Sequence, residues 1–285
     1  MIIQYTKAEH IKDLCYYEEV FAEIENENFE NSTYEAMRKK IEKDKQIPLL
    51  QMFRPHANFK SQTFYRIRKA SEFKEDKSLS CSFGPPPKEF TKIGRANLSG
   101  YPVLYLAFLP QTACRELDIS INEEVFLCEW KFIESNLGGI FYIGESNYMD
   151  VSWEQTIQKE NEIFNKKLRS YSRETSESLK YIKNKLSSWF LRDNRSLSSF
   201  LGHYFLYDTN LSNYSYPVDF IIYPSVADSY KGANFALASK SINKIELTLV
   251  YRAIVNEITD QGVSLTRIEV GKNIGDKIKW MACKN

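Results

Sequence analysis

Three isolated polar residues stand at the ends of apolar segments, where they could act on a bound molecule. They are Arg66 in FYRIR, Glu116 in TACREL and Ser225 in YPSVAD. Strand ends beside loops are where folds often carry binding and catalytic groups. Each residue also has a plain structural explanation: a salt bridge for the Arg, a turn for the Ser, and the helix dipole for a Glu in a first helical turn. The residues alone do not establish a shared site.

The span from Ile93 to Leu117, IGRANLSGYPVLYLAFLPQTACREL, is dense in such groups. It opens with a loop that could hold a phosphate and continues into a buried strand over residues 101–108. A helix follows, with Thr112 as its expected N-cap. This pattern places Glu116 at the head of the helix, and we interpret the neighbouring Arg115 as a surface residue.

The residue types exclude several other chemistries. The chain has only three histidines, none at metal-ligand spacing from Cys, Asp or Glu, so no metal site is predicted. Neither GxxxxGK[ST], GxGxxG nor GxSxG occurs, which leaves nucleotide triphosphate hydrolysis and serine-hydrolase chemistry without support. An enzyme built on this chain would therefore work with Arg, Glu, Ser and Tyr.

The composition is that of a globular protein with a sizeable core. Of 285 residues, 43% are hydrophobic and 26% charged, and 38 basic residues against 37 acidic ones give a net charge of +1. This balance argues against binding to nucleic acid or anionic lipid through bulk charge. The sequence contains no apolar run of about 18 residues, and its five cysteines form no CxxC pair. These features predict a soluble, cytoplasmic protein with free thiols.

The order of elements predicts an α+β fold. Residues 1–60 are expected to form a helical N-terminal extension, with Ser32 and Glu35 as a capping box. Residues 61–285 then form the main domain, in which strands surround a helical insert at about 152–208. The apolar residues of the insert are expected to pack in a core.

Three segments resemble the RES domain family, named for an Arg, a Glu and a Ser in that chain order. They are FYRIRKA, GRANLSGYPVLYLAFLPQTACRE and DFIIYPSVADSYKGANFAL. The middle segment is the most specific, because it combines a Gly-Arg-x-Asn loop, a GxPVLYLA strand and Thr-Ala-x-x-Glu. The resemblance covers roughly residues 62–250, without much of the helical insert.

This resemblance implies a fold like that of ADP-ribosyltransferases and an enzyme that consumes NAD+. Similar proteins include toxins of bacterial toxin–antitoxin pairs, with NAD+ phosphorolysis, NAD+ hydrolysis or ADP-ribosylation of a protein as activities. NAD+ would be the substrate and no cofactor would be required. Inorganic phosphate and a cognate antitoxin or other regulator are the further partners it implies.

Carried over by position, the resemblance implies a catalytic triad and a set of NAD+-binding residues. The triad is Arg66, Glu116 and Ser225. The residues expected to bind NAD+ are Tyr65, Arg95, Asn97, Tyr105 and Asn234.

The implied roles fit the chemistry of nicotinamide release. The bond at the ribose anomeric carbon breaks through an oxocarbenium-like transition state, which the Glu116 carboxylate could stabilise. Arg66, with Arg95 second, could hold the diphosphate bidentately. Ser225 could orient Arg66 or bind the ribose, and Tyr65 or Tyr105 could stack on the nicotinamide ring.

The chain departs from the family in its loop and its additions. The family loop usually reads GRWNPPG, whereas this one reads GRANLSG, so Ala96 removes an aromatic surface. The extension and the insert could bind a regulator, mediate oligomerisation or shape an acceptor site.

A degenerate RES domain that only binds a partner is therefore an alternative. An RNA-binding protein that uses NKKLRSYSR is a further one, disfavoured by the near-zero net charge.

Overall fold

The computed structural model describes residues 10–49, 52–141, 161–192, 195–208 and 218–283. Over these residues the fold is α+β, as predicted, with ten strands in one mixed sheet. The order is β1-β5-β6-β7-β3-β2-β4-β8-β9-β10, and every neighbouring pair is antiparallel except β5 and β6. The strands are β1 Met52–Ala57, β2 Thr63–Lys69, β3 Val103–Ala107, β4 Glu124–Phe132, β5 Leu137–Phe141, β6 Phe220–Pro224, β7 Ala233–Ala238, β8 Ile245–Ile258, β9 Val263–Ile274 and β10 Lys277–Ala282.

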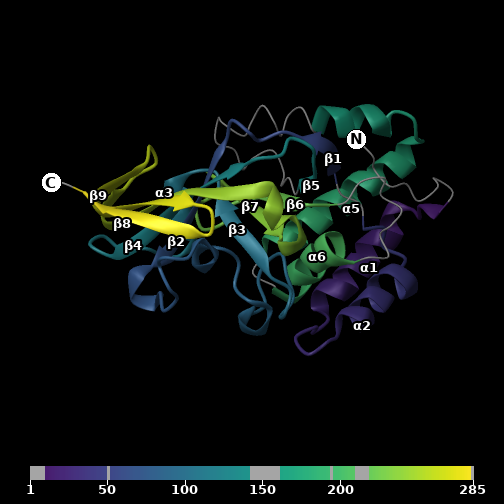
Figure 1. Ribbon diagram of the computed structural model, residues 1–285. Coiled ribbons are helices and arrows are strands. Elements are labelled where there is room, and N and C mark those ends of the chain that lie inside the picture. Colours follow the sequence, from purple (N-terminus) through teal and green to yellow (C-terminus); the bar gives the residue numbers. More distant parts are fainter. Residues whose placement is uncertain (1–9, 50–51, 142–160, 193–194, 209–217, 284–285) are drawn as a thin grey trace.

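All but one of the labelled α-helices gather at one end of this sheet, and the long strands β8 and β9 extend from the other, where α3 lies (Figure 1). The α-helices are α1 Leu14–Asn26, α2 Tyr34–Arg38, α3 Pro110–Glu116, α5 Arg173–Leu191 and α6 Arg195–Tyr207. Residues 161–168 are also helical. None of the described helices is long and apolar enough to cross a membrane.

The sheet is nearly divided between β2 and β3. A single pair of residues, Tyr65 and Ala107, joins the two strands. By contrast, β2 pairs with β4 along its whole length. Beyond the one shared pair, the edge of β2 from 66 to 69 and the edge of β3 from 103 to 106 have no common ladder. Because these two strand edges are unpaired, residues of both β2 and β3 line one cavity.

Side chains alternate across β2, as its sequence predicts, and pack into two cores. On one face the Phe64 ring lies 5.0 Å from the Phe235 ring, within the larger core. On the other face Ile67 joins Ala107 of β3 and Cys114 of α3 in a smaller core. The smaller core therefore fixes α3 beside the divide between β2 and β3.

The predicted N-terminal extension and helical insert pack against each other. The Phe21 ring of α1 lies 4.7 Å from the Trp189 ring of α5, and Trp189 Nε1 donates to Glu25 at 3.0 Å. Both aromatic side chains are fully buried. The two segments, distant in the sequence, thus form one helical layer.

Three local predictions were wrong. The extension is not helical throughout, because Met52–Ala57 forms strand β1 and pairs with β5. The side chain that caps α2 is Thr33, which accepts from the Ala36 N–H, and not Ser32. Helix α3 begins at Pro110, so Thr112 lies inside the helix and is not its N-cap. Proline is favoured in a first turn, where its missing N–H costs nothing. Residues 152–160 of the predicted insert lie outside the described residues.

Candidate functional site

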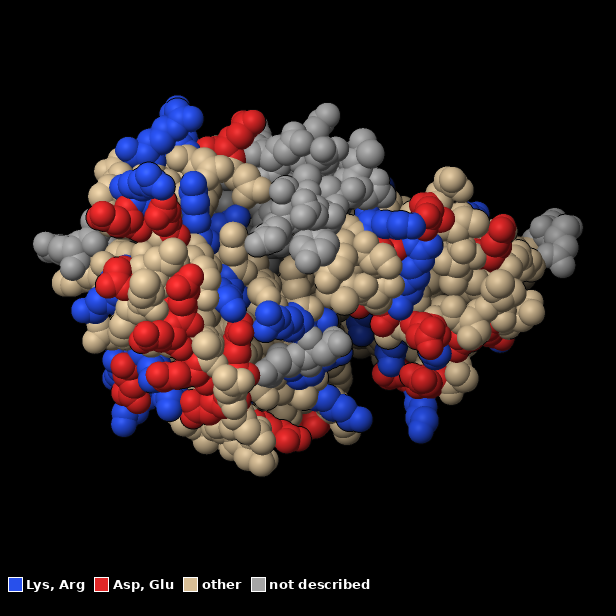
Figure 2. Space-filling model, turned by 180° about the vertical axis from the view of Figure 1, so that it is seen from behind, with Lys and Arg blue, Asp and Glu red and all other residues tan. Residues whose placement is uncertain are grey.

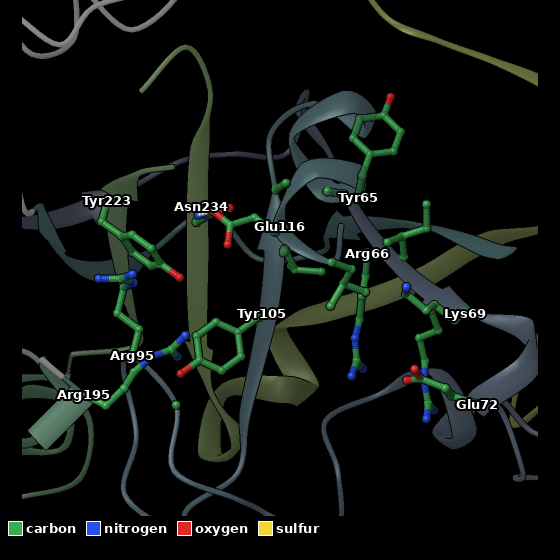
Figure 3. Close-up of a pocket in the computed structure, with 17 residues that line it drawn as sticks. Tyr65, Arg66, Lys69, Glu72, Arg95, Tyr105, Glu116, Arg195, Tyr223 and Asn234 are labelled. Carbon is green, nitrogen blue, oxygen red and sulfur yellow. Dashed lines mark hydrogen bonds between the residues drawn. The ribbon is translucent and has the colours of Figure 1, made fainter. Parts of the chain in front are cut away.

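A cavity of about 500 Å³ opens where β2 and β3 part. One wall is the end of β2, and the other combines β3, the loop before it and the end of β6. Helix α3 and the first residue of α6 complete the lining (Figure 3). The polar and charged lining residues are Tyr65, Arg66, Arg68, Lys69, Glu72, Arg95, Tyr105, Glu116, Arg195, Tyr223 and Asn234.

Glu116 lies in the middle of this cavity and is held through one carboxylate oxygen. Its Oε1 accepts from Ser225 Oγ at 2.5 Å and from Asn234 Nδ2 at 2.5 Å. Among the described residues, no group donates to its Oε2. The carboxylate therefore has a fixed orientation and one oxygen available to a bound molecule.

The position of Glu116 within α3 differs from the prediction. It is the last residue of the helix, not part of the first turn. A carboxylate there meets the negative end of the helix dipole, which disfavours it. The helix dipole consequently does not explain this Glu, whereas the two donors from Ser225 and Asn234 do.

Ser225 is fully buried and its hydroxyl has a defined direction. The oxygen accepts from the backbone N–H of Asp228 at 3.1 Å, so the hydroxyl hydrogen is directed at Glu116. Ser225 thus contacts Glu116, and the hypothesis that it orients Arg66 was wrong. The turn that follows contains two residues with positive φ, Ser229 at 49° and Tyr230 at 65°.

Asp228 fixes this turn through an ion pair that the sequence did not reveal. Its buried carboxylate accepts from Thr112 Oγ1 at 2.5 Å and pairs with the Arg115 guanidinium. Arg115 also contacts Asp260 at 2.8 Å. Thr112 is therefore not an N-cap, and Arg115 is not a simple surface residue, because both tie α3 to the turn behind Ser225.

Arg66 is a partly buried cation with part of its guanidinium available. Its Nη1 donates to the carbonyl oxygens of Phe83, at 2.7 Å, and Gly84. Burial lowers the pKa of Arg66 to about 10, so the group stays charged at neutral pH. Within the described part of the chain, no carboxylate forms an ion pair with it. Its Nη2 and Nε remain able to bind an anion side-on.

The neighbouring basic residues on β2 have acidic partners. Arg68 contacts Glu75 at 2.8 Å, and Lys69 contacts Glu123 at 3.3 Å. Positive charge at this wall is thus mostly compensated, which leaves Arg66 as its candidate anion-binding group.

Asn97 supports the cavity from behind and is not among the residues that line it. It is buried, and its Nδ2 donates to the carbonyl oxygens of Lys92 and Leu98. Tyr105 does line the cavity, and its hydroxyl donates to Asn97 Oδ1 at 2.7 Å and accepts from the Ala96 N–H at 2.8 Å. Burial raises the pKa of Tyr105, so this hydroxyl stays protonated. Asn97 therefore positions Tyr105 and the loop.

The absence of an aromatic residue at position 96 has a structural reason. Ala96 is fully buried. A Cβ placed on Gly202 of α6 would lie 2.3 Å from Ala96 Cα, so helix and loop are in direct contact. The insert occupies the space next to this position, and two small residues allow the close approach.

Arg95, from the same loop, is anchored to the end of α5. Its Nη1 donates to the carbonyl oxygens of Phe190 at 2.8 Å and Arg192 at 3.0 Å. Figure 3 shows Arg95 and Arg195 on the same side of Glu116 as Tyr223, and the charges of both arginines lower the pKa of Tyr223 against the larger effect of burial. The loop and the helical insert therefore meet at one end of the cavity.

Two tyrosines differ in how they relate to the cavity. Tyr65 packs against the smaller core, and its hydroxyl points away from Arg66 (Figure 3). Tyr223 is buried beside Glu116, and burial raises the pKa of its hydroxyl well above the ordinary value. Sequence reasoning missed Tyr223, although its position two residues before Ser225 was a signal. Sequence reasoning also missed Arg195, because nothing in the sequence of the insert indicated that this residue lines the cavity.

No protein-family model and no curated protein matches the chain. Among solved structures, the crystal structure of the M. tuberculosis MbcT–MbcA toxin–antitoxin complex is similar, with 13% sequence identity and a TM-score of 0.33. The match covers 70% of this chain and 86% of that one. At this TM-score, the description of the fold rests on the strands and helices themselves.

Proposed function

We propose that this protein cleaves the nicotinamide–ribose bond of NAD+, the activity that its resemblance to the RES domain family implies. The observation that best supports this function is the Glu116 carboxylate. It is held through Oε1 by Ser225 and Asn234 and leaves Oε2 toward the cavity. Arg66, a guanidinium without an acidic partner among the described residues, lines the same cavity.

In the proposed reaction, the C–N bond between ribose and nicotinamide breaks and its electron pair stays on the leaving ring. Because that ring is cationic in NAD+, it leaves neutral and needs no strong general acid. Positive charge then develops at the ribose carbon and ring oxygen, where Glu116 Oε2 stabilises it. Arg66 binds the diphosphate and fixes the ribose against the carboxylate.

An acceptor oxygen completes the reaction by supplying the electron pair of the new C–O bond. Water gives ADP-ribose and releases one proton, whereas phosphate gives ADP-ribose 1″-phosphate. A protein side chain as acceptor would make the enzyme an ADP-ribosyltransferase. We favour NAD+ degradation, in which the protein acts as a toxin or defence effector by depleting NAD+. A cognate antitoxin or other regulator would then restrain it.

NAD+ turnover with product identification tests this function. Purified full-length protein should release nicotinamide, and Glu116→Gln should lower kcat by about 10³-fold or more, in line with the loss of a main electrostatic stabiliser. Glu134→Gln, at an exposed residue outside the cavity, is the matched control. Mass spectrometry with and without phosphate identifies the acceptor.

Intact NAD+ after long incubation with folded protein, with and without phosphate, would contradict the proposal. Lysate supplied with labelled NAD+ provides protein acceptors and any activator. Binding of NAD+ without turnover under all these conditions would instead favour the degenerate binding module.

A further inference from the structure

Asp228, in the turn after β6, is a buried acid that the proposed reaction does not use. Its side chain is 1% exposed, and it is absent from the cavity wall that the described residues form. A buried carboxylate is costly unless it is both paired and hydrogen-bonded. Asp228 meets both conditions, because it accepts from Thr112 Oγ1 at 2.5 Å and pairs with the Arg115 guanidinium. The positions of these two partners connect Asp228 to the site.

Both partners lie on helix α3, which ends at Glu116. Thr112 and Arg115 are three positions apart, so their side chains lie on one face of the helix. Arg115 directly precedes Glu116 in the sequence. The carboxylate of Asp228 therefore holds the last turn of α3, which is the turn that carries Glu116.

The backbone of Asp228 holds the donor that faces Glu116. Its N–H donates to Ser225 Oγ at 3.1 Å, which leaves the hydroxyl hydrogen directed at Glu116 Oε1, 2.5 Å from Oγ. Two backbone hydrogen bonds close the turn: the Ser225 N–H donates to the Gly232 carbonyl oxygen, and the Lys231 N–H donates to that of Asp228, both at 2.9 Å. One residue thus fixes both the donor and the acceptor of the hydrogen bond between Ser225 and Glu116.

These contacts extend to the tip of the hairpin formed by β8 and β9. Arg115 Nη2 binds Asp260 Oδ1 at 2.8 Å, while Nη1 binds Asp228. Gln111 Nε2 donates to the Asp260 carbonyl oxygen at 3.2 Å, and Lys231 pairs with the Asp260 carboxylate. Because a planar guanidinium shared by two carboxylates has a fixed orientation, the hairpin tip keeps Arg115 directed at Asp228.

We propose that Asp228 is a positioning residue that acts on Glu116 through Ser225. This inference rests on the proposed function, because the direction of Glu116 Oε2 affects the rate only if that oxygen stabilises the transition state. A carboxylate that loses the Ser225 donor can rotate, and Oε2 then lies less often beside the reacting carbon. The chemical step is impaired, whereas NAD+ still binds through the other residues of the cavity wall.

The first test replaces the charge of Asp228 and keeps its shape. Asp228→Asn should lower kcat by about tenfold, which corresponds to one weakened charged hydrogen bond. The KM for NAD+ should stay within about twofold, because the interaction acts in the transition state. Both are measured by nicotinamide release from full-length protein.

Asp219→Asn is the matched control. Asp219 is also buried, accepts from Ser241 Oγ at 2.5 Å and pairs with Lys244 at 2.8 Å, but it does not line the cavity. Loss of a buried ion pair should lower the denaturation midpoint of both variants. Only Asp228→Asn should also lower kcat, and Asp219→Asn should keep kcat within about twofold of wild type.

A double variant shows whether Asp228 acts through Ser225. In a Ser225→Ala background no hydroxyl remains to be directed, so adding Asp228→Asn should change kcat by less than about threefold. A further tenfold loss in that background would overturn the inference. An equal loss of kcat in Asp219→Asn would overturn it as well, and so would a raised KM with unchanged kcat in Asp228→Asn.

NMR spectroscopy without substrate separates this inference from the proposed function. The side-chain amide of Asn234 donates to the same oxygen of Glu116 at 2.5 Å, so its proton and nitrogen shifts report on the carboxylate. The signal is assigned by its disappearance in Asn234→Ala. Asp228→Asn and Ser225→Ala should move it in the same direction, whereas Asp219→Asn should leave it in place.

The two measurements have distinct outcomes. If the Asn234 signal moves as expected but wild type releases no nicotinamide, Asp228 still positions the carboxylate and the proposed reaction fails. If wild type turns over NAD+ but the signal of Asp228→Asn stays at its wild-type position, the reaction stands and the positioning by Asp228 fails.

Discussion

At the residue scale, the central feature is the Glu116 carboxylate, which is held through one oxygen while no described residue donates to the other. Ser225 and Asn234 both donate to Oε1 of Glu116, and hydrogen bonds to a charged group contribute about 1.5–3 kcal/mol each. Holding the carboxylate in one rotamer removes a reorganisation step from the proposed reaction. The two donors come from β7 and from the end of β6, so the rotamer depends on the sheet.

A double-mutant cycle tests this shared role. Ser225→Ala and Asn234→Ala should each lower kcat/KM by about 10–100-fold, which corresponds to one charged hydrogen bond. The double variant should lose less than the product of the two, because a carboxylate already released by one change has less orientation left to lose. Losses that multiply fully would show that the two residues act independently.

The residues of the site were only partly predictable. Of the residues predicted from the sequence, six line the cavity: Tyr65, Arg66, Arg95, Tyr105, Glu116 and Asn234. Asn97 was predicted to bind NAD+ directly but lies behind Tyr105, since a short side chain in a tight loop satisfies local carbonyls. Pairing that joins distant segments leaves no local signal, and for this reason the partner of Arg115 was missed.

At the element scale, the site depends on the close approach of α3 and the turn after β6. Strands β2, β3 and β8 followed from alternating or continuous apolar residues, as expected for a sheet with buried faces. The start of α3 could not be predicted in the same way. Thr112 is a residue type that often caps a helix, but here its hydroxyl donates to Asp228. Its hydroxyl joins the helix to the turn, and Gly232 makes room for it.

Gly232→Ala should disrupt that junction. An added Cβ would lie 1.9 Å from Thr112 Oγ1 and 2.7 Å from Asp228 Oδ2, so Thr112, Asp228 or the turn must move. We expect a loss of about 1–3 kcal/mol in the free energy of unfolding, together with a lower kcat. Gly262→Ala is the matched control, because a Cβ there meets nothing within 4 Å. Denaturant unfolding and turnover measure both effects, and equal stability of the two variants would contradict the close approach.

At the scale of the whole molecule, charge is balanced and the helical layer is tied to the sheet. Figure 2 shows Lys and Arg interspersed with Asp and Glu over this face, consistent with the net charge of +1. The packing of α1 on α5, and of α6 on the loop with Ala96, means that a change in the helices reaches the cavity. The sequence separated extension, insert and core by composition, but their packing depends on contacts between segments far apart in the chain.

The helical layer should make the protein sensitive to mild acid through His203. This side chain is buried among the rings of Tyr34, Tyr101 and Tyr207, and its Nδ1 has no hydrogen-bond partner in the described structure. Burial lowers the pKa of His203 from 6.5 to about 4, while the charges of Asp208 and Glu35 oppose the shift. Because the folded value is the lower one, the unfolded chain binds the proton first as the pH falls.

Stability should therefore decline between about pH 6.5 and pH 4, by about 3 kcal/mol from this residue alone. His203→Phe, which cannot be protonated, should lose about that much less than wild type over the same interval. His10→Gln, at an exposed histidine, should follow wild type. Denaturant unfolding at several pH values measures the difference. Parallel curves for wild type and His203→Phe would show that His203 is protonated as easily in the folded protein as in the unfolded chain.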